Sequence, residues 1–536
     1  MFVNSLKISL SLTFGSKTET VVAGNIKNIE LRLDSHGYWA KLDWWAICLK
    51  SSSEDKVYPS FIKPDIIKVK ISIDRTFDKV GSKTEALVLK GIVTQKSLEE
   101  RAFSDISGEP VLHRHYTIEF RDIAQVLWSQ HFPTNLWVDK TLKNIFIDNK
   151  HKDMKFAYTW PDLNTKHPVL ALGLGEGDAS FYDFMIWLLK SEYAGLSYDH
   201  NNDKYEIIAK KKDLGKIQDV CGEDVEVVET IFPEIDRHKT TILNSYSEKP
   251  KTKDVINKQA EKGVVQHRLF ASQVASDLGK RDTLEKKLIK QRDPQLKVTM
   301  ARYPSFTIRP GMLMTFKDDW SSNLFFSKNK YRVLQNHIVC HAEKQGATAN
   351  DGDESNRFEI SFVSHMEKKE DPVFSYPEHT APEWPFYVEG KILSEEGAKT
   401  EDTYQFYTDK ATSLDYYKVK IPLWKNQKVI APYDANLAMG NYYFPLYKDE
   451  RVVMALSLRT ARIERCIDWR AGTRLPKETQ GNHLLLGKKD KSKTSIRHIY
   501  ENKKPLLNIT RLSDKDTQII EIKEGRIMLE TQEKDK

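Results

Sequence analysis

Short runs of alternating apolar and polar residues dominate the first 120 residues. Ile8, Leu10, Leu12 and Phe14 alternate with polar residues, which is the period-2 pattern of a half-buried strand. Further strand patterns, separated by turn formers, cover 26–33, 39–49, 66–73, 86–94 and 115–120. This spacing predicts an antiparallel barrel or sandwich.

The apolar period becomes helical after residue 120. One helical face carries Ile123, Val126 and Leu127, and after a break at Pro133 the repeat continues with Val138, Leu142, Ile145 and Phe146. The clearest unit spans 178–210. It reads as a helix with Asp178 or Ser180 as N-cap, an apolar stripe at 181–189 and Gly195 as its C′ residue, then a hairpin with a polar turn at 200–203.

The second half of the chain returns to strands. Residues 246–298 are Lys-rich, with helical segments around 268–290, and read as a solvated connector or exposed insertion. Strand patterns resume at 299–364, a Pro-rich bridge at 371–385 marks a domain boundary, and 384–460 reads as a small closed β-barrel. Beyond 480 the pattern has too few apolar residues to bury a core alone, so this tail is either frayed or paired with copies of itself.

Bulk composition narrows the class of protein. The 536 residues exceed one ordinary core, and 40% hydrophobic with 30% charged residues is a globular profile. A net charge of +7, from 83 Lys+Arg against 76 Asp+Glu, is too weak an excess to indicate nucleic acid. The four cysteines form no CxxC pair, which suits a reducing compartment, and no apolar run suggests a signal peptide or a transmembrane helix.

Four groups of residues are candidates for a catalytic or ligand-binding role, and a structural role is the favoured interpretation of each. Gly173–Gly177 is GxGxG without a Walker lysine, which favours a tight turn over a phosphate cradle. The pair His113 and His115 lacks further metal ligands, and Cys340-His341 has no visible triad partner. The remaining group is acidic: Glu395, Glu396, Glu401 and Asp402 offer clustered carboxylates in a polar loop, where solvated charge is the default.

Basic runs raise the alternative of a nucleic-acid-binding barrel. They lie at 210–212 and 488–493, and the aromatic residues of that barrel are Tyr404, Phe406, Tyr407, Tyr416 and Tyr417. A solvated or partner-facing surface is the favoured reading. The sequence therefore predicts no catalytic residue, no metal site and no cofactor.

Three segments, in order, resemble the VgrG family, the spike proteins of type VI secretion systems related to the hub and spike of contractile phage tails. The segments 116–127 with 138–145 resemble a hub strand and helix, and 180–200 resembles the Phe-rich helix that leads into a strand. In the third, the motif residues of an oligonucleotide-binding (OB) type barrel are Gly390, Pro422, Trp424, Gly440, Pro445 and Glu450. Lys448 stands where the family pattern has a glycine, and the tail after the barrel is shorter than the usual triangular β-helix.

The resemblance implies a mainly β fold with an α+β insert: two hub-type β-barrels, an OB-type barrel and a short C-terminal β-helix, a triangular prism formed in a trimer. The implied domains are 1–120 (first hub barrel), 121–230 (insert), 231–375 (second hub barrel with connector), 384–475 (OB-type barrel) and 480–536 (spike tail). In the trimer, neighbouring chains would bury the tail residues Ile520, Ile522, Ile527 and Leu529.

The function implied by the resemblance is mechanical. A homotrimeric hub-spike subunit would cap a hexameric inner-tube protein, contact baseplate proteins, carry a PAAR-like tip protein or an effector, and transiently puncture a target membrane. It would assemble in the cytoplasm and leave by contraction without a signal peptide. Nucleic acid is not an expected partner. The alternatives are a phage or tailocin baseplate hub, a nucleic-acid-binding protein, and a carbohydrate-active enzyme using the acidic loop.

Overall fold

The structure is a computed structural model, and it divides the chain into two compact units. Its described residues are 3–49, 51–76, 85–104, 110–175, 177, 179–244, 251–270, 275–304, 306–316, 323–327, 329–347, 355–397, 403–408, 415–432, 446–467, 482–489 and 492–533. The first unit comprises Met1–Pro133, Leu142–Thr165 and Leu174–Glu383, and the second comprises Thr134–Thr141, Lys166–Gly173 and Trp384–Lys536.

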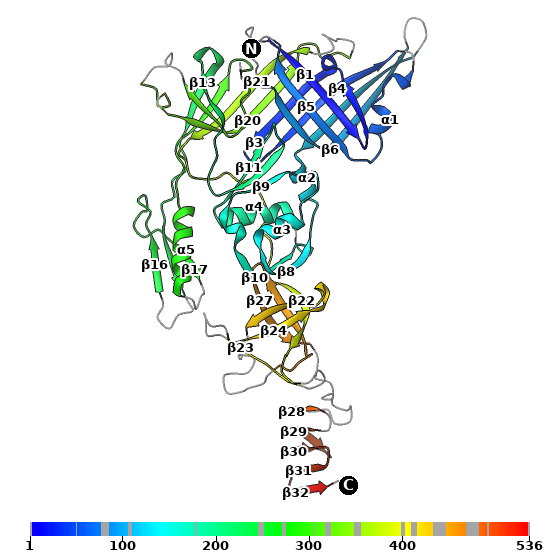
Figure 1. The fold of residues 1–536 in the computed structure, drawn as a ribbon, viewed down its shortest axis with the longest axis vertical. Coiled ribbons are helices and arrows are strands. Elements are labelled where there is room, and N and C mark those ends of the chain that lie inside the picture. Colours follow the sequence, from blue (N-terminus) through cyan, green and yellow to red (C-terminus); the bar gives the residue numbers. More distant parts are fainter. Residues whose placement is uncertain are drawn as a thin grey trace. The chain divides into compact units, whose positions relative to one another are not determined.

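Eight antiparallel strands of the first unit pair in a closed ring, the topology of a β-barrel (Figure 1). In ring order they are β20 (Tyr331–Ala342), β3 (Ile26–Asp34), β4 (Gly37–Cys48), β7 (Pro110–Arg121), β6 (Leu87–Ser104), β5 (Ile67–Arg75), β1 (Val3–Phe14) and β21 (Ser355–Lys368), which returns to β20. The short strand β2 (Lys17–Val21) pairs with β1. The turns η1 (Ala23–Asn25) and η2 (Ser52–Glu54) and the helix α1 (Tyr58–Phe61) lie between these strands in the chain.

The ring forms because its strands alternate apolar and polar residues. Leu6, Ile8, Leu10 and Leu12 of β1 are all buried, as the period-2 pattern predicted. Aromatic side chains fill part of the core, where Trp44 stacks on Tyr116 with ring centroids 5.0 Å apart. The predicted strands of the first 120 residues are thus confirmed, but closing the ring needs β20 and β21 from more than 200 residues later.

Strands β20 and β21 also belong to a second, open group of strands. The added strands are β13 (Leu214–Val220), β14 (Val225–Ile231), β18 (Gln295–Met300) and β19 (Met312–Phe316), with η4 (Gly222–Asp224) between β13 and β14. The order is β13-β19-β20 on one side and β21-β18-β14 on the other. Among the described residues β13 and β14 have no strand beyond them, so each presents a free edge.

A small helical and mixed segment completes the core of the first unit. Its helices are α2 (Ile123–Trp128), α3 (Leu142–Asp148), η3 (Pro161–Asn164) and α4 (Phe181–Ser191), and its sheet consists of β9 (Phe156–Tyr158), β11 (Gly195–Asp199) and β12 (Lys204–Ile208). The predicted cap of α4 is confirmed: Ser180 accepts from the backbone N–H of Asp183, whose side chain accepts from the backbone N–H of Ser180. The other candidate cap, Asp178, lies outside the described residues.

Two expectations for this segment were wrong, and a third was confirmed. Val138 does not continue a helix, because it lies in β8 (Thr134–Thr141), opposite Val169 of β10 (Lys166–Gly173). Gly195 does not end α4: the left-handed residue is Tyr193, and Gly195 opens β11, where the ring of Phe374 fills the space that a side chain would need. The predicted hairpin is confirmed: β11 pairs with β12 around the turn at 200–203, in which His200 is buried.

Residues 239–288 form a separate small fold, here called the arm. It contains a sheet in the order β16-β15-β17 and one helix, namely β15 (Lys239–Asn244), β16 (Lys251–Val255), β17 (Val265–Phe270) and α5 (Ala275–Leu288). The predicted helical character around 268–290 is confirmed by α5. The two strands β16 and β17 were not foreseen, because Lys-rich sequence masks their alternation.

The second unit contains two further sheets. The first has the order β23-β24-β22-β26-β27, with β25 paired to β24, and its strands are β22 (Phe386–Leu393), β23 (Tyr407–Thr408), β24 (Asp415–Ile421), β25 (Gln427–Pro432), β26 (Arg451–Ser457) and β27 (Thr460–Cys466), with η5 (Pro422–Trp424) after β24. The tail is an antiparallel meander of β28 (Asn482–Lys489), β29 (Ser492–Glu501), β30 (Lys504–Leu512), β31 (Asp516–Lys523) and β32 (Arg526–Glu533). None of the helices within the described part of the chain has the length and apolar character needed to span a membrane.

The buried His200 generates a pH prediction. Its ring lies 5.0 Å from Tyr198 and 6.3 Å from Tyr38, and burial lowers its pKa from 6.5 to about 3. The unfolded chain therefore takes up a proton below pH 6.5 that the folded chain refuses, so stability present above that pH is lost as the pH falls. Relative to a His200→Gln variant, the wild type should lose about 1.4 kcal/mol of unfolding free energy per pH unit below 6.5. Urea unfolding of both proteins between pH 7 and pH 4 measures this, and parallel pH profiles would contradict it.

Candidate assembly surfaces on the barrel segment and tail

The sheet of residues 384–466, here called the barrel segment, encloses an apolar core. Its buried members include Ile392, Tyr417, Val419, Val452 and Met454. The antiparallel pair of β8 and β10 also packs into this core through Leu136, Val169 and Ala171. The backbone N–H of Ala171 donates to the carbonyl of Leu458 at 3.0 Å. The segment is therefore filled with packed side chains.

Gly390 lies where three strands of the barrel segment approach most closely. A Cβ at this position would lie 2.6 Å from Cγ1 of Val419 and 2.9 Å from Cγ of Met454. Both atoms belong to buried side chains on the neighbouring strands β24 and β26. The absence of a side chain at 390 is what lets the core close at this point.

The other motif residues of the barrel segment are turn residues. Pro422 opens the turn η5, in which Trp424 packs against the core, and Lys425 follows in the left-handed conformation. Glu450 sits in the turn before β26, where its carbonyl accepts from the backbone N–H of Ile392 at 3.0 Å. Gly440 and Pro445 lie outside the described residues.

The turn before β26 shows how the chain manages without the glycine of the family pattern. Lys448 does not adopt a positive φ; the next residue, Asp449, does, at 63°. The Asp449 carboxylate is 2.9 Å from Nζ of Lys420 on β24. Aspartate tolerates the left-handed region better than most residues, so this turn forms one residue later than the pattern suggests.

Apolar side chains line one face of the tail meander in two cross-strand rows. The first row runs through all five strands: Leu484, Ile496, Ile509, Ile520 and Leu529. The second row, two residues along each strand and so on the same face, is His498, Leu507, Ile522 and Ile527. The sequence pointed to the members from β31 and β32 through their alternation, but the rows across earlier strands became visible only with the register.

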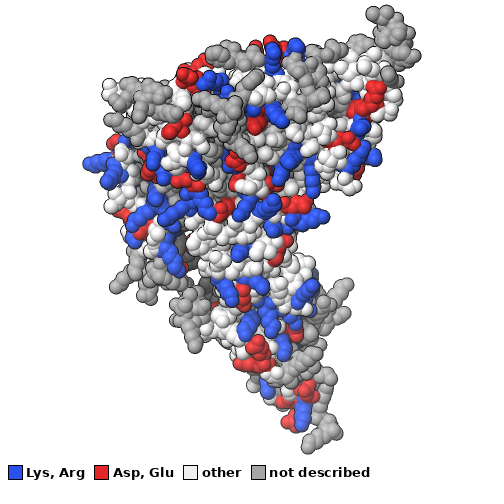
Figure 2. Space-filling model, turned by 45° about the horizontal axis from the view of Figure 1, so that its top comes forward, with Lys and Arg blue, Asp and Glu red and all other residues white. Residues whose placement is uncertain are grey.

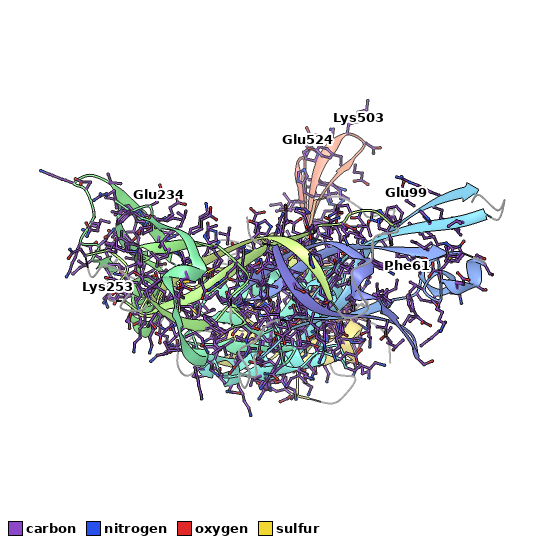
Figure 3. All side chains as sticks on the ribbon, turned by 90° about the horizontal axis from the view of Figure 1, so that it is seen from above. Phe61, Glu99, Glu234, Lys253, Lys503 and Glu524 are labelled. Atoms are coloured by element: carbon purple, nitrogen blue, oxygen red, sulfur yellow. The ribbon has the colours of Figure 1, made fainter. Side chains whose placement is uncertain are left out.

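This apolar face of the tail is uncovered in the single chain. Ile527 is 71% exposed and Leu529 is 75% exposed, while Ile520 and Ile522 are 39% and 41% exposed. The strands themselves are held by tight turns at 502–503 and 524–525, and the salt bridge between Lys504 and Glu524 joins these neighbouring turns; Figure 3 labels Lys503 and Glu524 there. Among its described residues, the tail is thus a well-registered sheet whose apolar rows are exposed on β31 and β32 and only partly buried on β29 and β30.

The acidic loop of the barrel segment holds no catalytic arrangement among its described residues. Glu395 is exposed and its carboxylate is 3.3 Å from Nζ of Lys418, which also lies over the ring of Tyr407 at 3.9 Å. Glu396 is likewise exposed. Glu401 and Asp402 lie outside the described residues, so the proposed clustering of four acids remains a prediction.

The histidine pair occupies the outer face of the eight-strand ring. His115 stacks on Trp45 with ring centroids 4.4 Å apart, and its Nε2 is 3.0 Å from a carboxylate oxygen of Asp43. The ring of His113 is oriented edge-on to the same Trp45 ring, with ring centroids 6.4 Å apart. In the part of the chain that the structure describes, no three His, Cys, Asp or Glu side chains are grouped as metal ligands.

The remaining candidates have structural surroundings. Cys340 is buried, and burial raises the pKa of its thiol to about 12, which removes the nucleophilic thiolate at neutral pH. Gly173 faces the ring of Phe386, whose atoms lie 2.3 Å from where a Cβ would be, so this glycine serves close packing. Lys211 bonds the buried Glu367 at 2.5 Å, and Lys212 pairs with Glu206.

The charge distribution and the aromatic residues of the barrel segment bear on the nucleic-acid alternative. Figure 2 shows Lys and Arg interspersed with Asp and Glu over the visible face. Of the aromatics of the barrel segment, Tyr417 is fully buried and Phe406 packs against the core beside it, with ring centroids 5.0 Å apart. These two rings are committed to packing and do not form a stacking platform for bases.

Comparisons with known proteins bear on the fold. No family model matches the chain, and no curated protein matches it in sequence. In structure it resembles a chain of the PdpA–VgrG complex in its lidless state, with a TM-score of 0.72 and 14% identity over 99% of both chains. It also resembles a chain of the lidded Francisella PdpA–VgrG complex, with a TM-score of 0.72 and 15% identity over 99% of this chain and 80% of that one.

At these identities the likeness establishes the fold alone. The chain has a VgrG-like hub-spike fold, and the resemblance drawn from the sequence is confirmed at that level. The predicted fold class, mainly β with a smaller α+β part, is also confirmed.

The packing at Gly390 gives a stability prediction for the barrel segment. A Gly390→Val substitution should destabilise it by about 1–3 kcal/mol, because Val419 and Met454 must move to admit the new side chain. Hydrogen exchange of amides in β22 and β24 measures the effect, and these amides should exchange at least about fivefold faster. Lys391→Ala, at the adjacent half-buried position, is the matched control and should leave exchange nearly unchanged. Equal exchange in both variants would contradict the packing argument.

Proposed function

We propose that this chain is a structural hub-spike subunit of a contractile injection apparatus and that it works as a homotrimer joined through its tail. The observation that carries the proposal is the uncovered pair of apolar rows on the tail meander. The VgrG-like fold over the whole chain supports the same reading. The work assigned to the molecule is mechanical, so no catalytic residue is required.

The tail argument rests on the cost of exposing apolar surface. A sheet with one apolar face needs a second layer, and the described part of the tail brings none of its own. Burying a large aliphatic side chain contributes about 1.5–3 kcal/mol, so covering Ile527 and Leu529 alone is worth ~3–6 kcal/mol per chain. Copies of the same tail supply matching rows at the same heights. The number three comes from the hub-spike resemblance, since the burial argument requires only that other copies cover the face.

The remaining roles follow from the same proposal. The first unit would form the hub that caps a hexameric inner tube and meets baseplate proteins. The barrel segment would transmit force to the tail, which suits its packed core. The tail would carry a PAAR-like tip protein or an effector into the target membrane. In this proposal the protein assembles in the cytoplasm and is exported by contraction of the apparatus.

The oligomeric state tests the proposal directly. Native mass spectrometry of the full chain at micromolar concentration should give a trimer of the 62.1 kDa chain. A monomer with an intact tail would overturn the proposal.

A substitution on the apolar rows should weaken that trimer. Ile527→Ser with Leu529→Ser removes two of the most exposed apolar side chains of the tail, and ~3–6 kcal/mol of association free energy per chain should be lost. Dilution-dependent mass measurements should show dissociation at concentrations where the wild type stays assembled. The control is Glu530→Ser with Gln532→Ser, at positions of the same strand that face away from the apolar rows, and it should assemble like the wild type. Equal dissociation of both variants would contradict burial of the rows.

A further inference from the structure

Two strands of the first unit each have one edge without a partner among the described residues. β14 pairs only with β18, and β17 pairs only with β15. The strands are similar in length, seven and six residues. An open edge offers unpaired backbone N–H and C=O groups and accepts a further strand readily.

The two edges carry opposite charge. The segment 223–236, which contains β14, has six acidic residues and no Lys or Arg. The arm with its adjoining residues, 239–290, has twelve Lys and Arg against six Asp and Glu, an excess of six in a chain whose total is +7. Nearly all of the net positive charge of the protein is thus concentrated next to its most acidic strand.

Much of this charge already has a partner, and the remainder lies at the edges. Around β14, Asp224 pairs with Arg302 and Glu229 with Lys297. In the described residues the acids left without an ion pair are Glu226, Glu234 and Asp236. The exposed bases of the arm left without an ion pair are Lys258, Lys262, Arg268 and Lys287. Figure 3 labels Glu234, just beyond the end of β14.

Apolar side chains accompany the charges on both edges. Phe232, one residue after β14, is 67% exposed, and its ring lies 5.6 Å from the also exposed Phe325. In the arm, Leu269 of β17 is 77% exposed and Ile256 is 82% exposed. Exposed apolar groups rimmed by unpaired charge are typical of a protein–protein contact.

The described residues of the arm form only a small apolar core. Its buried apolar cluster consists of Ile242, Val255 and Leu278, with Ile289 partly buried against them. A unit of about 50 residues with such a core is marginal without outside support. Docking the open edge of β17 onto another sheet would provide that support.

We propose that β17 of one copy adds to the free edge of β14 in a second copy, forming a continuous sheet between neighbouring subunits of the hub. Backbone hydrogen bonds would give the affinity, and the acidic and basic residues would select the partner edge. The contact joins two different surfaces, so repetition in a closed assembly makes a ring. The inference rests on the proposed homotrimer, in which three identical contacts would close.

Pairing within one chain is disfavoured by the connection between the two sheets. The two strands are not paired in the single chain. Residues 236–238 are already fastened to the arm: the side-chain amide of Asn257 donates to the carbonyls of Asp236 and His238, and the backbone N–H of Glu261 donates to the carbonyl of Arg237. Only residues 232–235 then remain to span from β14 to the arm, a reach of about 13 Å.

Zero-length carbodiimide cross-linking of the wild-type full chain tests the contact. Cross-links from Glu226 or Glu234 to Lys258 or Lys262 should be at least tenfold enriched in the covalent dimer and trimer bands over the monomer band. The native mass of the full chain reports the proposed trimer independently, because Lys523 and Glu501 already lie 3.8 Å apart within one tail and their cross-link would not. A trimeric mass without the β14–arm cross-links overturns this inference and leaves the trimer intact. A monomeric mass with no cross-linked bands overturns both.

Hydrogen exchange with charge reversal tests the same contact without the cross-linker. The outward-facing amides of β17 should be protected at least tenfold more in the assembly than a free edge allows. Glu226→Lys with Glu234→Lys should remove most of that protection, and adding Lys262→Glu with Arg268→Glu should restore it. Glu370→Lys with Glu383→Lys makes the same change of charge at other exposed sites and should leave protection intact. Fast exchange of β17 in the wild-type trimer, or no rescue by the combined variant, would overturn the inference.

Discussion

A β-strand has to satisfy hydrogen-bonding groups along both edges and cover its apolar face, and this constraint organises the whole chain. In the first unit, eight strands meet it by closing a ring, which leaves no edge within the ring. The closure depends on β20 and β21, which pair with each other and with strands from the N-terminal third of the chain. Where strand edges are paired and apolar faces are covered within the chain, the fold needs no partner chain.

Among the described residues the same constraint is left unmet in several places, and assembly is proposed at two of them. The tail satisfies its strand pairing but leaves its two apolar rows uncovered. The edges of β14 and β17 leave hydrogen-bonding groups free, beside complementary charge. The tail has an exposed apolar face, whereas β14 and β17 have unpaired edges. Copies of the chain can satisfy both at once, because the two surfaces are different. A mechanical part gains rigidity when neighbouring subunits share sheets and cores.

Local patterns were sufficient for much of the fold. Alternation located the strands of the eight-strand ring. The candidate N-cap at Asp178 or Ser180 and the apolar stripe at 181–189 located α4, and the structure shows a capping box at Ser180. The return of β20 and β21 could not be read, because pairing between distant strands leaves no local trace. The pairing of β8 with β10 is also distant in the chain, so the sequence around Val138 looked helical. The pair in fact packs into the barrel segment. Burial of His200 was also hidden, since a His-Asn-Asn-Asp sequence is typical of an exposed turn.

The sequence predicted part of the candidate assembly surface on the tail. Alternation marked Ile520, Ile522, Ile527 and Leu529, but the register was needed to show that they continue rows from earlier strands. The central claim is that copies of the chain bury these rows around a common axis. A low-resolution electron-microscopy reconstruction of the purified full-length particle, calculated without imposed symmetry, tests it most directly. The account predicts threefold symmetry with a single narrow spike on a ring-like base; particles of one chain, or particles in which the tails remain apart, would contradict it.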